Sequence, residues 1–189
     1  DQPNSKGVFE ANSLMLLKMI KSFNYGMDFA GRPFKIEPKQ IFPFAVVNAY
    51  AKNFGSLEKK MHLKIQNGAV GVITQPVFDI ENVKKLLENF ENAKENVEGD
   101  KRKAQLIFGV FPITKLRTAL FLSAQVPGIH VPQFWIDELE KAHNISEEEE
   151  YKVGMQLSKN LFDEINRIHP KIHLMTANNK FEVASEILA

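Results

Sequence analysis

Apolar runs alternate with amphipathic segments along this chain, and the alternation predicts strands followed by helices. Four apolar runs, at 42–47, 70–73, 104–110 and 172–176, have the length of buried strands. After each run, apolar residues recur at spacings of three and four, which is typical of a helix with one buried face. Such alternation favours parallel pairing with right-handed crossovers. The predicted fold class is therefore α/β, with about four parallel strands.

Capping residues and glycines place the ends of the predicted helices. The starts are predicted, in chain order, at Asn12 or Ser13, near Ser56, after Asp79, near Leu116, at Pro132, at Ser146, and at Asn178 or Asn179. Ser146 and Glu149 have the spacing of a capping box, and Asn67–Gly68 supplies a C-terminal stop. Residues 92–103 are highly charged and lack an apolar period, so they are predicted to form a turn region.

Composition restricts the classes of function. The chain has 189 residues, of which 44% are hydrophobic and 25% charged, so we expect one globular domain over 1–189. Its net charge of +1 provides no field that would attract nucleic acid or an anionic membrane. The absence of cysteine excludes disulfides and thiol catalysis and fits a reducing compartment. Since no signal peptide or bilayer-length apolar run occurs, cytoplasmic localisation is expected.

Polar side chains stand where the predicted strands end. They are Asn48, Gln75, Thr114, and Thr176 with Asn178. Because the carboxyl ends of parallel strands meet at one rim, we expect a ligand site there. The five histidines are scattered without a carboxylate cluster, so no metal site is predicted, and His173 is expected to be a hydrogen-bonded core residue. These residues alone do not name the ligand.

Three segments resemble parts of the methylenetetrahydrofolate reductases. Gly68–Asp79 is similar to the strand whose Gln contacts folate in that family, and Gly109–Thr114 is similar to the next strand and its proline turn. Gln125–Pro132 resembles a segment of the subgroup that is fused to homocysteine methyltransferases. The resemblance implies a (β/α)8 TIM barrel. Because such a barrel typically needs about 250 residues, the chain is expected to be its C-terminal part.

The resemblance implies a flavoenzyme. In this family NAD(P)H reduces FAD, which then passes a hydride to 5,10-methylenetetrahydrofolate and gives 5-methyltetrahydrofolate. The general-acid glutamate of the family lies on a first strand that this chain lacks, so the chain is expected to be inactive alone. The alternative is a non-catalytic barrel subunit that docks on a methyltransferase partner.

The resemblance also assigns contacts to folate. Gln75 is the expected pterin contact, since an amide both donates and accepts hydrogen bonds. Thr118 stands where some relatives have a folate-contacting amide, and Lys180 stands near an arginine that reaches the glutamate tail. Asp1 matches an acidic residue near the flavin and the pterin, where it would tune the flavin electrostatically. The alternative for Asp1 is a disordered terminal residue.

A second group of residues is assigned to FAD by the same resemblance. The expected contacts are Phe9, Ser13, Asn48, Lys60 and Lys64. Lys64 matches the lysine that approaches the flavin diphosphate, with Lys60 and Lys59 as alternatives on the same helix. A helix cap explains Ser13 almost as well, and any of the lysines could be solvated surface.

A half barrel would leave parts of its sheet uncovered. The strands at 42–47 and 172–176 would then be open edges, beside an uncovered inner face. We therefore predict self-association through the open side, with a homo-oligomer, a folate and a homocysteine methyltransferase as the expected partners.

Overall fold

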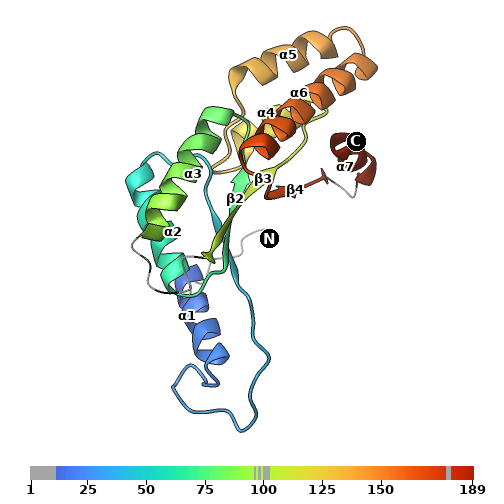
Figure 1. Ribbon diagram of the computed structural model, residues 1–189. Coiled ribbons are helices and arrows are strands. Elements are labelled where there is room, and N and C mark those ends of the chain that lie inside the picture. Colours follow the sequence, from blue (N-terminus) through green and yellow to red (C-terminus); the bar gives the residue numbers. More distant parts are fainter. Residues whose placement is uncertain (1–11, 96, 98, 100–102, 178–179) are drawn as a thin grey trace, which may run out of the picture.

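Four parallel strands form a single sheet in the computed structural model, which describes residues 12–95, 97, 99, 103–177 and 180–189 (Figure 1). The strands are β1 (Phe44–Val47), β2 (Gly71–Pro76), β3 (Gln105–Val110) and β4 (Ile172–Leu174). Their spatial order follows the chain, and every pairing between neighbours is parallel. The predicted α/β class with sequential parallel strands is confirmed.

Seven helices occur in the described part of the chain. They are α1 (Ser13–Asn24), α2 (Phe54–Gln66), α3 (Ile80–Glu95), α4 (Leu116–Gln125), α5 (Gln133–His143), α6 (Glu147–Ile168) and α7 (Phe181–Leu188). The predicted caps are confirmed at Asp79, whose Oδ1 accepts from the Asn82 amide, and at Ser146, whose Oγ accepts from the Glu149 amide. None of the described helices combines the length and the apolar character needed to cross a membrane.

Several predicted boundaries were wrong for local reasons. α2 begins at Phe54, because Asn53 is the N-cap and its side chain accepts from the Ser56 amide at 2.9 Å. α3 continues to Glu95 through the predicted turn, since Ala93 extends its buried face. β1 begins only after Pro43, whose nitrogen has no hydrogen to donate to a ladder. The candidate caps Asn178 and Asn179 lie outside the described residues.

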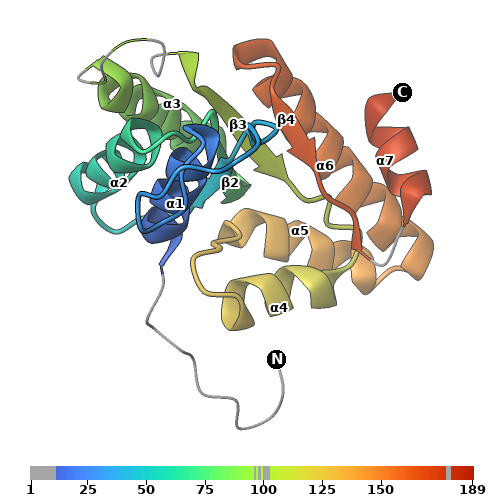
Figure 2. The ribbon, with the colours of Figure 1, turned by 90° about the horizontal axis from the view of Figure 1, so that it is seen from below.

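One face of the sheet is covered by helices and holds the core. Val47, Val72, Leu106 and Phe108 from the strands pack with Leu57, Met61 and Ile65 of α2, Val83, Leu86 and Phe90 of α3, and Leu161 and Ile165 of α6. α2 and α3 lie side by side, and α4 and α5 lie together near the carboxyl ends of the strands (Figures 1 and 2). Loops follow the carboxyl ends of β1 and β2 and lead into α2 and α3.

The opposite face carries exposed side chains. Phe44 and Val46 on β1 are 53% and 60% exposed. His173 on β4 is also exposed, so its prediction as a core residue was wrong, because alternate strand positions point away from the helices. α1 and the segment 25–43 extend away from the sheet (Figure 1). An open face of the expected kind is present, and self-association stays a prediction.

Candidate functional site

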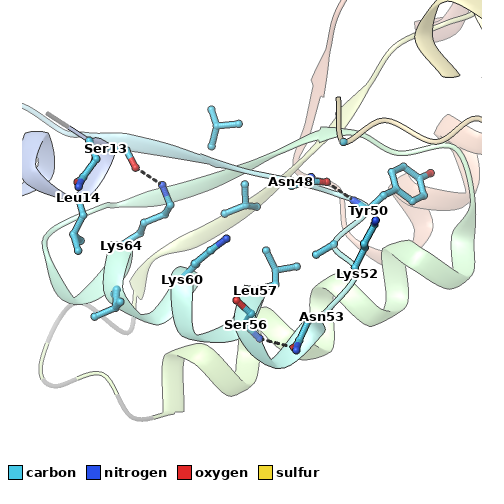
Figure 3. A pocket seen from close by; sticks show the side chains of 16 residues that line it. Ser13, Leu14, Asn48, Tyr50, Lys52, Asn53, Ser56, Leu57, Lys60 and Lys64 are labelled. Carbon is cyan, nitrogen blue, oxygen red and sulfur yellow. Dashed lines mark hydrogen bonds between the residues drawn. The ribbon is translucent and has the colours of Figure 1, made fainter. Parts of the chain in front are cut away.

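A cavity of about 830 Å3 lies at the carboxyl end of β1, between the start of α1 and the length of α2. It is lined by Asn12, Ser13 and Leu14, by Val46, Val47, Asn48, Tyr50, Ala51, Lys52 and Asn53, by Ser56, Leu57, Lys60, Leu63 and Lys64, and by Gly128. Ser13 and Lys64 lie at one end of it, Asn48 and Tyr50 at the other, and Lys60 between them (Figure 3).

Positive charge distinguishes this cavity. Lys52, Lys60 and Lys64 line it, and no aspartate or glutamate is among its described lining residues. The Lys64 ammonium donates to the Ser13 hydroxyl at 3.0 Å. Burial lowers the pKa of Lys64 below its ordinary value, and the neighbouring charge of Lys60 lowers it further. An anion bound here would relieve that repulsion, so the cavity is suited to a negatively charged ligand.

The start of α1 explains how Ser13 becomes available. Asn12 is the N-cap, and its side chain accepts from the Met15 amide at 2.9 Å. Ser13 is therefore not needed as the cap, and its hydroxyl contacts Lys64 instead. Of the two sequence interpretations of Ser13, the structure supports the residue as part of the cavity wall.

Asn48 lines the other end of the cavity, and a second amide side chain, that of Gln75, lies beside it near Gly128. Asn48 follows β1, and Gln75 lies near the end of β2. Gln75 Nε2 donates to the Pro127 carbonyl at a long 3.3 Å, and its Oε1 is buried without a hydrogen-bond partner among the described residues. A buried amide oxygen without a partner is costly unless a ligand satisfies it. Gln75 therefore has unused hydrogen-bonding capacity at the rim.

Gly128 covers both amides. Its φ of +83° is readily accessible only to glycine, and it belongs to the loop between α4 and α5. A Cβ added to Gly128 would lie 2.4 Å from Asn48 Nδ2 and 2.6 Å from Gln75 Oε1. The absence of a side chain at this position lets the loop approach the two amides.

A second, smaller cavity of about 90 Å3 lies at the carboxyl ends of β3 and β4. It is lined by Phe111, Pro112, Thr114, Lys115, Arg117, Thr118, Thr176, Ala177, Lys180 and Val183. The predicted residues Thr118 and Lys180 meet there, together with the cations Lys115 and Arg117. Hydroxyl groups and cations in one hollow favour a ligand with carboxylate groups.

Comparisons with known proteins identify the family. A model of the methylenetetrahydrofolate reductase family matches residues 3–189. The chain belongs to this family. The reductase family has the TIM-barrel fold, so the four strands are part of such a barrel. No curated protein matches the chain.

One solved structure shows the same fold. It is an uncharacterized protein from Clostridium thermocellum, described as binding two copies of 5-methyl-5,6,7,8-tetrahydrofolic acid. The match has a TM-score of 0.53 and 21% sequence identity, and it covers 77% of this chain and 50% of that chain. The chain therefore spans about half the length of that structure. At this identity the likeness concerns the fold alone.

The residues expected from the resemblance to reductases fall into two groups. Ser13, Asn48, Lys60 and Lys64 line the large cavity, whereas Thr118 and Lys180 line the small one. Gln75 contacts the loop that carries Gly128, next to Asn48. Asp1 and Phe9 lie outside the described residues. In the described part of the chain, no group of three His, Asp or Glu side chains could hold a metal ion.

Some residues that line these two cavities could not be recognised in the sequence. Tyr50 and Gly128 line the large cavity, and Arg117 lines the small one. The position of Arg117 could have identified it as a candidate, because it lies one residue before Thr118 in the first turn of a helix at the rim. Thr74, which also lies near the end of β2, lines neither cavity. It is buried, and its hydroxyl accepts from the Gly109 amide at 2.9 Å, which is a structural contact between strands.

Proposed function

We propose that the chain supplies the FAD and folate contacts of a methylenetetrahydrofolate reductase. In the whole enzyme, FAD would carry a hydride from NAD(P)H to 5,10-methylenetetrahydrofolate, giving 5-methyltetrahydrofolate. The observation that carries the proposal is the cavity with three lysines and no carboxylate among its described lining residues. Asn48 and Gly128 line one end of it, and Gln75 lies next to Gly128. Family membership supports the same reaction.

The residues of the large cavity fit the parts of FAD. Lys60 and Lys64 provide charge for a diphosphate, and Ser13 provides a hydroxyl donor beside Lys64. Val46, Leu57 and Leu63 supply apolar wall. Asn48 stands at the rim end, where its Nδ2 could donate to a flavin carbonyl.

The folate contacts follow from the amide and the cations. Gln75 has a buried acceptor oxygen without a described partner and a weakly held donor, so it can donate to and accept from a pterin edge. Lys180 and Arg117 could pair with the glutamate tail, and Thr118 could donate its hydroxyl. Lys180 acts as a point charge, whereas Arg117 offers a planar fork that matches a carboxylate.

The Lys64→Met variant is expected to bind FAD more weakly, because methionine keeps the length and helix propensity of the side chain but removes its charge. Fluorescence titration of FAD measures the change, which should shrink as salt is raised.

The matched control is Lys59→Met. Lys59 is an exposed residue on the same helix and does not line the cavity. Equal affinities of Lys64→Met and the unmodified chain at low salt would remove Lys64 from the flavin site. Equal weakening by both variants would mean that general charge, and not the cavity, attracts FAD.

The open face supports a further proposal, that the chain self-associates. Phe44 and Val46 expose apolar surface on β1, and β1 and β4 are the edges of the sheet. Exposed edges and apolar faces favour pairing with another chain. We expect sedimentation to detect a dimer whose population rises with concentration, and a monodisperse monomer without a bound partner would contradict this.

Membership of the subgroup that is fused to homocysteine methyltransferases stays a prediction. It rests on Gln125–Pro132, which forms the loop over Asn48 and Gln75 and the entry into α5. A homocysteine methyltransferase partner is proposed on the same ground. The rival proposal of a non-catalytic docking subunit differs in one measurable respect, because it requires no flavin in the large cavity.

A further inference from the structure

Tyr50 connects two loops at the rim. It lies in the loop between β1 and α2, and its hydroxyl accepts from the Phe78 amide at 2.7 Å. The same hydroxyl donates to Asp79 Oδ2 at 3.1 Å. Phe78 and Asp79 follow β2, three and four residues after Gln75, so the Tyr50 hydroxyl ties the segment after one strand to the segment after the next.

A second bond joins the same two loops. Asn82 Nδ2 donates to the Ala49 carbonyl at 2.8 Å, and the backbone amide of Asn82 donates to Asp79 Oδ1 at 2.7 Å. Ala49 precedes Tyr50 and is fully buried. Asp79 and Asn82 at the start of α3 therefore hold the segment after β1 by two separate contacts.

Tyr50 also sets the orientation of Asn48. The backbone amide of Tyr50 donates to Asn48 Oδ1 at 2.7 Å, as Figure 3 shows. Because the oxygen of Asn48 is used in this bond, its Nδ2 faces Gly128. The Tyr50 ring meets the His130 ring edge-on, with centroids 5.5 Å apart, and His130 lies in the same loop as Gly128.

The hydroxyl of Tyr50 remains a donor under ordinary conditions. Burial raises the pKa of Tyr50 above its usual value, and the negative charge of Asp79 raises it further. The hydroxyl thus stays protonated and keeps both of its bonds. Since its single O–H donor is used within the protein, it is not available to donate a hydrogen bond or a proton to a ligand.

We propose that Tyr50 is a positioning residue that fixes Gln75 for folate and holds the loop of Gly128 against Asn48. This inference rests on the proposed folate site. Without the Tyr50 hydroxyl, the turn at Phe78 and Asp79 would keep only the Asn82 bond to the neighbouring loop, and Gln75 would be held less firmly. A misplacement of about 1 Å is enough to weaken a hydrogen-bonded ligand substantially.

A double-mutant cycle tests the inference. Tyr50→Phe keeps the ring and its contact with His130 and removes only the hydroxyl. We expect it to weaken binding of 5-methyltetrahydrofolate to the FAD-saturated chain by roughly tenfold, as measured by calorimetry. If Tyr50 acts through Gln75, the same change in a Gln75→Ala background should have less than about a twofold effect.

The control is Tyr151→Phe on α6. Tyr151 also donates its hydroxyl to a carboxylate, that of Glu186 at 2.9 Å, but does not line either candidate cavity. The Tyr151→Phe variant should leave folate affinity unchanged. If Tyr50→Phe unfolds at a much lower temperature than the unmodified chain, Asn82→Ala takes its place in the cycle. This variant removes the other bond between the two loops, and its effect on folate affinity should depend on Gln75 in the same way.

Two kinds of outcome would contradict the positioning role of Tyr50 and the folate site separately. Unchanged affinity in folded Tyr50→Phe, or an equal loss with and without Gln75, would overturn the positioning role while the proposed function stands. An unmodified chain that binds FAD but no folate would overturn the folate site itself, and the inference about Tyr50 with it.

Discussion

The Gln75→Ala variant is expected to lose roughly ten- to a hundredfold in folate affinity, because one or two hydrogen bonds to the pterin cost about 1–3 kcal/mol. The expectation follows from its buried Oε1, which has no partner among the described residues, and its long bond to Pro127. In the whole enzyme, flavin reduction by the nicotinamide should stay largely unchanged. Rapid-mixing measurements of the two half-reactions separate these effects.

The Gln75→Glu variant separates the loss of the amide donor from the loss of side-chain volume. It keeps the length of the side chain but replaces the amide donor by an acceptor, so folate affinity should fall nearly as far. An equal loss in both half-reactions for either variant would show that Gln75 is structural. Retained folate turnover in Gln75→Glu would show that donation by the amide is not used.

The Gly128→Ala variant is expected to impair both FAD and folate binding. Its Cβ would displace Asn48 Nδ2 and Gln75 Oε1, which are the flexible ends of the two rim side chains. Because these ends can rotate away, the steric cost to folding is small, and the loss should appear in binding. We expect folate affinity to fall roughly as far as in Gln75→Ala, about ten- to a hundredfold.

Gly31→Ala separates this effect from backbone strain. Gly31 has a φ of +80°, almost the same as the +83° of Gly128, but a Cβ there would meet nothing within 4 Å. Both variants should lose about 1–2 kcal/mol of unfolding free energy from the positive φ. Denaturant unfolding and ligand titration check the pair, and equal binding by the two variants would contradict the role of Gly128.

The fold was predictable because its signals are local. Apolar runs and their spacing gave the four parallel strands in order, and the caps at Asp79 and Ser146 placed two helices. The ends of elements depended on weaker signals. Ala93 continues the buried face of α3 although the residues around it are charged, and the exposed His173 depends on which strand face the helices cover.

The site was predictable only in part, for a different reason. Ser13, Lys60 and Lys64 came from a resemblance in sequence, and the structure brings them together in one cavity. Tyr50 acts through bonds to residues 28 and 29 positions away, which no periodicity reveals. Gly128 could be recognised as a chain break, but its approach to Asn48 exists only in the folded chain.

Comparison of FAD with riboflavin tests the central claim most directly. If Lys60 and Lys64 hold a diphosphate in the large cavity, the chain should bind FAD at least about tenfold more tightly than riboflavin, which has no phosphate. This preference should decrease as salt is raised and be largely lost in Lys64→Met. Equal affinity for the two flavins, or no flavin binding at all, would contradict the account.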